Sequence, residues 1–195
     1  MVLFGGTFDP IHNGHLHLAI ACRETVPFDK MLLMPSHLPP HKAKASAPDG
    51  DRLALCRLAS ESLDWMEVSS LELERTGPSY TIDTVSRLER LYPETEWSLL
   101  IGSDMLYYFP HWHRFEELLQ KVTLLSAVRE TEEDDRLREQ ADALRELGGR
   151  VELIPAPALP LSSTQLREML RAGEDVSPFL LPQAAAYIRE HHLYE

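Results

Sequence analysis

The sequence predicts an α/β protein built on one parallel sheet with helices on both faces. Short apolar runs of strand character alternate along the chain with segments of helical periodicity. The apolar runs are nearly continuous, which is typical of strands that are buried on both faces. Right-handed crossover helices then lead to a doubly wound, Rossmann-like sheet. In such sheets, ligands bind beyond the carboxyl ends of the strands, so we look for function there.

Length and composition fit a single domain. The chain has 195 residues, of which 44% are hydrophobic and 26% charged, and is long enough to bury one substantial core. We therefore expect residues 1–195 to form one domain. The net charge of -12 argues against a nucleic-acid or membrane-surface binder, because both partners are polyanions.

The cysteine pattern and the lack of long apolar runs bear on location. Cys22 and Cys56 lack C-x-x-C spacing, and we interpret them as reduced core thiols of a cytoplasmic protein. No run of 18 apolar residues and no signal-peptide pattern occur in the sequence, so export and membrane spanning are not expected. The oligomeric state is not fixed by the sequence, and a homodimer stays open.

Six strands and their crossover helices are expected in alternation. The strands are Val2–Phe4, Met31–Met34, Met66–Val68, Trp97–Ile101, Val122–Val128 and Val151–Ile154. A first helix begins near Asn13, a second follows Asp49, and a third carries an apolar face behind Ser79 as its N-cap. Residues 130–146 predict an exposed amphipathic helix. Helices from Ser163 onward form a small C-terminal part that packs through Ala184, Ala185, Tyr187 and Ile188.

The opening stretch, GGTFDPIHNGHL from Gly5 to Leu16, predicts an anion site. Gly5 and Gly6 would let the backbone turn sharply after the first strand, before a helix whose first amides are unpaired. His12 and His15 lie one helical turn apart and would point toward the same anion. The alternatives are an ordinary turn with structural histidines, or a metal pair. The usual helical zinc spacing and a third ligand are not evident.

Two further stretches suit the same anion. Lys42 lies in the proline-rich segment 35–48, which predicts a loop, and offers a positive charge there; the alternative is a solvated basic loop. The sequence LSSTQLR follows the last strand, with Ser162 or Ser163 as helix cap and Arg167 one turn inside. Serine caps are also common in ordinary helices.

These stretches resemble known signatures. GGTFDPIHNGHL and LSSTQLR are similar to the G-x-F-x-P-x-H-x-G-H and I-S-S-T-x-x-R motifs of the nucleotidyltransferase superfamily of adenylyl- and cytidylyltransferases. PPHK at 39–42, GPSYTIDTV at 77–85 and IGSDMLYYFPHWHRFEELL at 101–119 resemble its nicotinate mononucleotide adenylyltransferase branch. The motifs run in family order from residue 3 to about residue 170. Leu161 and His113 depart from the commoner isoleucine and tyrosine; the first is a packing change, and the second matters only if the His113 side chain, rather than its backbone amide, meets the substrate.

The resemblance implies a Rossmann-like nucleotidyltransferase fold and adenylyl transfer from ATP to nicotinate mononucleotide, with Mg²⁺ delivered by ATP. It implies catalytic roles for His12, His15, Lys42 and Arg167. ATP would be bound by Gly5, Gly6, Thr7, Phe8, His12, His15, Gly102, Asp104, Ser162, Ser163 and Arg167. The acceptor would be bound by Tyr80, Thr81, Trp112, His113, Asp104 and Lys42. Without the resemblance, the alternative interpretations are a helix cap for Asp104 and a core residue for Trp112.

Other functions remain open at this point. The same chemistry could serve nicotinamide mononucleotide, phosphopantetheine or, with CTP, a phosphorylated alcohol. A nucleotide-binding regulatory module without catalysis is the alternative from another class. GPSYT and the Trp112 segment argue against the last two acceptors, and the combination of His12, His15, Lys42 and Arg167 argues against the module.

Overall fold

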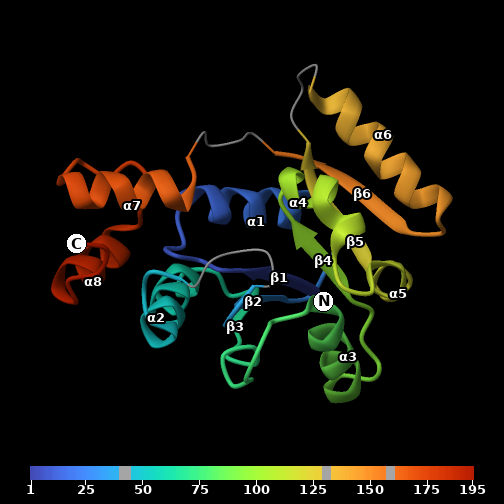
Figure 1. Ribbon diagram of the computed structural model, residues 1–195, viewed down its shortest axis with the longest axis horizontal. Helices are drawn as coiled ribbons and strands as arrows, with labels where there is room; N and C mark the ends of the chain where they lie inside the picture. Colours follow the sequence, from blue (N-terminus) through green and yellow to red (C-terminus); the bar gives the residue numbers. More distant parts are fainter. Residues whose placement is uncertain (40–44, 129–132, 157–160) are drawn as a thin grey trace.

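The computed structural model describes residues 1–39, 45–128, 133–156 and 161–195, which form one six-stranded sheet with helices around it (Figure 1). The strands are β1 (Val2–Gly6), β2 (Met31–Pro35), β3 (Met66–Val68), β4 (Ser98–Ile101), β5 (Thr123–Val128) and β6 (Arg150–Pro155). They are all parallel and lie in the order β3-β2-β1-β4-β5-β6. This is the order of a doubly wound Rossmann-like sheet, so the predicted fold class is confirmed.

Helices fill the crossovers that the sequence predicts, and others follow the last strand. They are α1 (Asn13–Thr25), α2 (Asp49–Ser60), α3 (Thr81–Leu91), α4 (Ser103–Tyr108), the 3₁₀ turn η1 (Phe109–His111), α5 (Phe115–Lys121), α6 (Glu133–Glu146), α7 (Ser163–Ala172) and α8 (Pro182–Glu190). Within the described ranges, each helix is too short or too polar to cross a bilayer.

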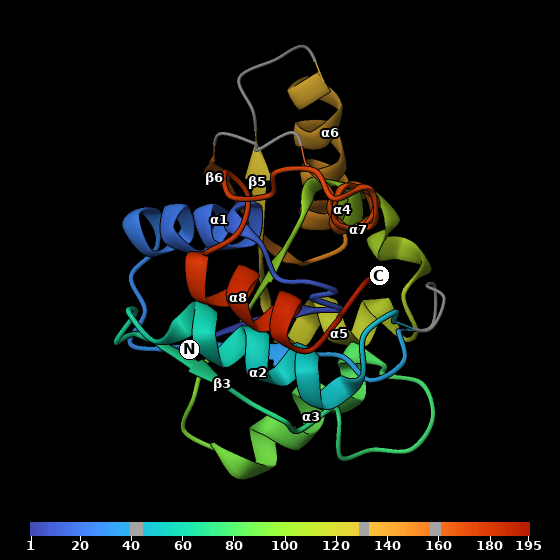
Figure 2. The same ribbon diagram turned by 90° about the vertical axis from the view of Figure 1, so that its left-hand side faces the viewer.

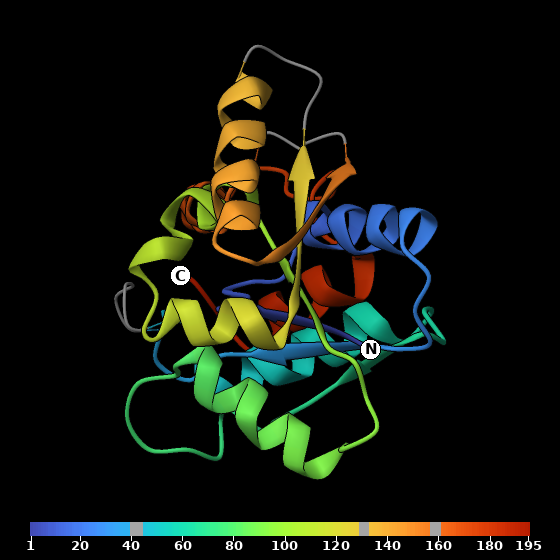
Figure 3. The same ribbon diagram turned by 90° about the vertical axis from the view of Figure 1, so that its right-hand side faces the viewer.

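The two faces of the sheet carry separate hydrophobic cores, because successive side chains of a strand point to opposite faces. On one face, strand residues such as Phe4 and Leu33 pack with helices α1, α2 and α8. On the other face, Leu3 and Met34 pack with helices α3, α5 and α6. Figures 2 and 3 show these layers from the two sides. Burial on both faces explains why the strands read as continuous apolar runs.

The C-terminal helices lie at one end of the sheet. Helix α8 runs alongside α2, where Figure 2 shows the two helices side by side. Ala184 and Ile188 are buried in the core there, and Ala185 and Tyr187 pack against it, which confirms the predicted contacts. Helix α6 buries Leu137, Ala141 and Leu144 as its periodicity predicts, while Leu147 lies beyond its end and is exposed.

The strand order reverses between β1 and β4. The chain goes from β1 to β2 on one side, and later places β4 on the other side of β1. The segments that follow Gly6 and Ile101 therefore leave the same edge of the sheet beside each other. A crevice at this reversal is the usual ligand site of such sheets.

Candidate active site

His12 and His15 cap the first helix with their own side chains. His12 is the N-cap of α1, and its Nδ1 accepts a hydrogen bond of 3.1 Å from the amide of Gly14. Nδ1 of His15 accepts one of 3.2 Å from the amide of His12. An imidazole nitrogen that accepts carries no proton, so both neutral rings carry it on Nε2. The two ring centres are 3.8 Å apart, so the two imidazoles lie against each other.

This capping changes one prediction about the anion site. We expected the first amides of α1 to be unpaired, but the amide of Asn13 donates to the carbonyl of Phe179 at 2.9 Å, and those of Gly14 and His15 bond to His12. The amides at this helix end are therefore used within the protein. An anion at this site would therefore be bound by side-chain donors rather than by these amides.

Burial keeps His12 neutral. The residue is 7% exposed, and desolvation lowers the pKa of its imidazole from 6.5 to about 4. The charged form is disfavoured because a buried cation loses its hydration. At neutral pH the side chain thus has the fixed tautomer of a neutral hydrogen-bond donor.

The role predicted for Gly5 and Gly6 as the turn itself is wrong. Both belong to β1 and pair with Met34 and Pro35 of β2. A Cβ at Gly6 would stand 2.9 Å from the ring of Phe8, whereas a Cβ at Gly5 would meet nothing within 4 Å. Glycine is thus needed at position 6 for the packing of Phe8. The space beside Gly5 leaves its backbone open to a ligand.

Phe8 makes the turn instead. Its φ is 47°, in the left-handed region that bulky residues rarely adopt. The ring is buried and meets His15 edge to face, with ring centres 5.1 Å apart. Thr7, just before it, is half-buried. The turn thus sets where the His15 ring lies.

Helix α7 joins the opening stretch. Ser162 is its N-cap, as one of the two predicted serines, and its Oγ accepts from the amide of Gln165 at 3.2 Å. Oγ of Ser163 donates to the carbonyl of Pro10 at 3.1 Å. Arg167 donates to the carbonyl of Asp9 at 2.7 Å. The structure therefore brings the start of α7 against the residues that lead into α1.

Gly102 and Asp104 follow β4 at the same edge of the sheet. Gly102 is the N-cap of the short helix α4, and Asp104 is exposed in its first turn. A Cβ at Gly102 would stand 2.7 Å from Oδ1 of Asp104, so the carboxylate folds back over the glycine. Asp104 lies beside the strand-order reversal, where a nucleotide is expected.

A second group gathers near the start of α3. Tyr80 is the N-cap of this helix and Thr81 its first residue, so Ser79 is not the cap that we predicted. The rings of Tyr80 and His113 lie 4.3 Å apart. Trp112 is half-buried and packs on Phe109 with ring centres 5.3 Å apart.

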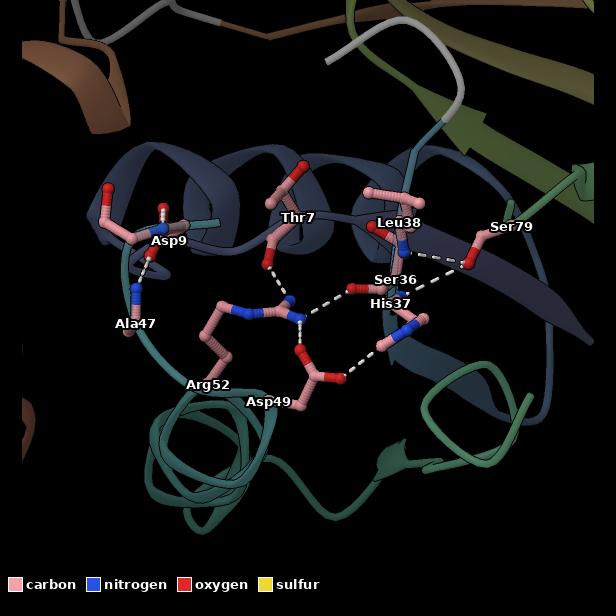
Figure 4. A network of polar contacts seen from close by, with 10 residues as sticks. Thr7, Asp9, Ser36, His37, Leu38, Ala47, Asp49, Arg52 and Ser79 are labelled. Carbon is pink, nitrogen blue, oxygen red and sulfur yellow. Dashed lines mark hydrogen bonds and ion pairs between the residues drawn. The ribbon is translucent and has the colours of Figure 1, made fainter. Parts of the chain in front are cut away.

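Ser79 has a different role. Its Oγ accepts from the amides of His37 at 3.2 Å and Leu38 at 3.3 Å, both just after β2 (Figure 4). The loop that begins at Ser36 is thereby fixed to the segment that carries Tyr80. Lys42 lies outside the described residues.

Sequence reasoning missed two charged residues of this region. The carboxylate of Asp9 is 5% exposed and accepts from the amides of Ser46 at 2.7 Å and Ala47 at 3.0 Å. Arg52 is 0% exposed inside α2. An aspartate before a proline predicts only a turn, and an arginine on a helix predicts a solvated face, so neither carried a signal of burial.

No cluster of three or more His, Cys, Asp or Glu side chains suited to a metal occurs in the part of the chain that the structure describes. The charged and polar side chains that the site brings together are imidazoles and a guanidinium. Such a set suits phosphate oxygens.

Comparison with known proteins gives the class first. Residues 3–169 match the cytidylyltransferase-like family model. A probable nicotinate-nucleotide adenylyltransferase of Bacillus pumilus is 40% identical over 195 residues, covering 99% of this chain and 97% of the relative. One of Aeromonas salmonicida is 39% identical over 205 residues, covering 99% and 96%. The chain therefore belongs to the nicotinate-nucleotide adenylyltransferases of the cytidylyltransferase-like family.

A solved structure agrees on the fold. Nicotinic acid mononucleotide adenylyltransferase of Plasmodium falciparum, complexed with NaAD, superposes with a TM-score of 0.78 at 18% identity, covering 99% of this chain and 96% of that one. A second structure of that protein, complexed with APC, gives 0.77 at 17% identity with the same coverage.

Proposed function

We propose that this chain transfers the adenylyl group of ATP to nicotinate mononucleotide, giving deamido-NAD and pyrophosphate, by direct in-line displacement without a covalent intermediate. The pair of imidazoles at the start of α1 carries the proposal. Each ring uses Nδ1 for the helix cap, and both rings lie at the edge of the sheet where a nucleotide is expected. Family membership supports the same activity.

The acceptor phosphate is the nucleophile in this reaction. Its second pKa is about 6, so it is largely dianionic at neutral pH and needs no general base. Catalysis then consists of positioning two polyanions and stabilising charge on the phosphoryl oxygens. Nε2 of His12 and His15 would donate to the α- and β-phosphate oxygens. Because His12 is held neutral by burial, it donates without the cost of burying a cation.

The remaining phosphates would be held from α7. Arg167, Ser162 and Ser163, with the amides at the start of α7, would bind the β- and γ-phosphates; the amide and hydroxyl of Ser162 would exchange their bonds to Gln165 for bonds to phosphate. Magnesium would enter as the ATP complex, bound through phosphates and water. Lys42 would offset charge where the two substrates meet.

ATP would otherwise be bound mainly by backbone at the strand-order reversal. Gly5, Gly6, Thr7 and Phe8 would line the phosphate side. After β4, the backbone of Gly102 would contact ATP. The carboxylate of Asp104 would accept hydrogen bonds from the ribose hydroxyls. The exposure of Asp104 supports this role.

The pyridine end would lie near the start of α3. Trp112 would supply a face for stacking, and the backbone amides near Thr81 and His113 would receive the nicotinate carboxylate. The contact between Tyr80 and His113 supports one shared site, because it joins the two segments. Backbone amides at the start of a helix bind a carboxylate well, because the helix dipole is positive there.

We further propose that residues 1–195 act as one nucleotidyltransferase domain, with the helices from residue 163 completing the ATP site. The bonds of Ser163 and Arg167 to the opening stretch support that role. We propose the cytoplasm as the location, where buried, unpaired Cys22 and Cys56 would stay reduced.

The experiment is pyrophosphate release from ATP and magnesium, with nicotinate mononucleotide, nicotinamide mononucleotide or no acceptor. Release with the nicotinate form alone, with deamido-NAD as product, supports the proposal. A preference for the nicotinamide form would keep the mechanism and refute the carboxylate assignment. No release with either would refute the acceptor class.

A further inference from the structure

Arg52 is a fully buried cation that bonds to two other segments and to its own helix. Its Nη1 donates to the carbonyl of Thr7 at 2.5 Å, after β1. Its Nη2 donates to the carbonyl of Ser36 at 2.7 Å, after β2, and to Oδ1 of Asp49 at 2.5 Å, in the first turn of α2 (Figure 4). Arginine is rarely buried without a partner, so a fully enclosed guanidinium indicates a specific requirement.

The carboxylate of Asp49 balances this charge. Burial acts to raise the pKa of Asp49, but hydrogen bonds from His37 and Arg52 outweigh it and hold the pKa below its ordinary value. Asp49 is therefore ionised at neutral pH. It pairs with Arg52 on one side and with Nδ1 of His37 on the other. Asp49 thus orients the guanidinium toward the two carbonyls.

The two carbonyls lie where the sheet stops connecting β1 and β2. The strands pair up to Gly6 and Pro35, and the amide of Ser36 still donates to the carbonyl of Gly6 at 2.8 Å. Beyond that point, Arg52 bridges the carbonyls of Thr7 and Ser36. The guanidinium thus takes the place of the next backbone hydrogen bond between the two strands. It fixes the spacing of two loops that backbone pairing no longer holds.

The turn after Thr7 needs such support. Phe8 has a positive φ, which persists only when its surroundings hold it there. The carbonyl before Phe8 is held by Arg52, and the carbonyl of Asp9 after it by Arg167. The Phe8 ring in turn contacts His15. A loss of the Arg52 bonds would therefore move the His15 imidazole.

We propose that Arg52 is a positioning residue for adenylyl transfer, which acts through Thr7 and Phe8 on the donors His12 and His15. The inference rests on the function proposed above. Lysine keeps the charge but not the flat fork that reaches two carbonyls at once. A displacement of about 1 Å remote from the chemistry can cost about 100-fold in rate. We therefore expect Arg52→Lys to lower kcat by about 10- to 100-fold and to change the KM for ATP by less than about threefold.

The experiment compares Arg52→Lys and Arg52→Met with Arg57→Met, a matched control on the exposed face of the same helix. Thermal unfolding identifies the folded variants, and kcat and KM are measured for both substrates. A folded Arg52→Lys with lowered kcat, beside an Arg57→Met with wild-type kcat, supports the proposal. A folded Arg52→Lys with kcat within twofold of wild type overturns it.

A second readout needs no turnover. The imidazole nitrogen signals of His12 and His15 in NMR spectra are expected to move in Arg52→Lys and to stay unchanged in Arg57→Met; unchanged signals in both would overturn the proposal. An inactive wild type would count against the proposed function, while this readout still tests Arg52. If both Arg52 variants fail to fold, Asp49→Asn replaces them, with the same lowered kcat required and wild-type kcat overturning the inference.

Discussion

Lowering the pH tests whether burial keeps the His12 imidazole neutral in the folded protein. We compare the wild type with His12→Asn, because an asparagine can still cap α1 through its side-chain oxygen but does not titrate. An exposed histidine on the same helix provides the control variant His17→Asn. The unfolding free energy of each protein is measured from pH 7 to pH 4.

The magnitude follows from the pKa of His12. The unfolded chain takes up a proton near pH 6.5, and the folded chain only near pH 4. Between these values the unfolded state binds more protons, so stability falls as the pH falls. One pKa unit is worth about 1.4 kcal/mol, so the full loss approaches about 3 kcal/mol at and below pH 4. Above pH 6.5, proton uptake by His12 no longer lowers the free energy of unfolding.

The expected result is a difference between wild type and His12→Asn that declines by up to about 3 kcal/mol from pH 7 to pH 4, since other titrating groups are common to both. The His17→Asn protein should follow the wild type. An NMR titration should place the pKa of His12 near 4. A His12 midpoint between 6 and 7, or parallel stability curves, would refute the argument that burial keeps this imidazole neutral.

Three further predictions concern turnover and reactivity. His15→Ala should lower kcat by about 100- to 1000-fold, as expected for the loss of one preorganised donor, while the protein still folds with a modestly lower thermal midpoint because the capping bond from the amide of His12 is lost; His17→Ala is the control, and unchanged turnover in His15→Ala would refute the assigned role. Gly102→Ala should turn the Asp104 carboxylate aside, since its new Cβ would stand 2.7 Å from Oδ1. The KM for ATP should then rise about tenfold, the scale of one charged hydrogen bond, while folding is retained; a wild-type KM would argue against ribose binding there. Burial raises the pKa of both cysteine thiols to about 12, so a thiol reagent at pH 8 should label them only after unfolding, and fast labelling of native protein would contradict their burial.

Much of the fold could be predicted because the relevant signals are local. The six apolar runs predict all six strands, with ends within about two residues, since burial on both faces leaves a continuous pattern. The predicted start of α1 near Asn13 is confirmed as well. Ser162, named as one of two possible caps, is the N-cap of α7, where a serine has its usual role.

The errors arise where a side chain bonds to a distant segment. Ser79 looked like a cap by its place before α3, but its hydroxyl bonds to amides after β2, some 40 residues earlier. Gly6 looked like a turn residue, but it makes room for the ring of Phe8. Arg52 gave no signal at all, because the carbonyls of Thr7 and Ser36, from two other segments, meet it only in the folded chain.

The joining of α7 to the opening stretch has a consequence for synthesis on the ribosome. Ser163 and Arg167 bond to Pro10 and Asp9, and Asn13 bonds to Phe179, so the first residues of the site are completed by residues made more than 150 positions later. The central strand can begin to pair early in translation, since domains fold as units while the chain emerges. If α7 completes the ATP site as proposed above, the nascent chain gains that site only after this helix has left the exit tunnel. Competence to bind ATP then follows the pairing of the strands.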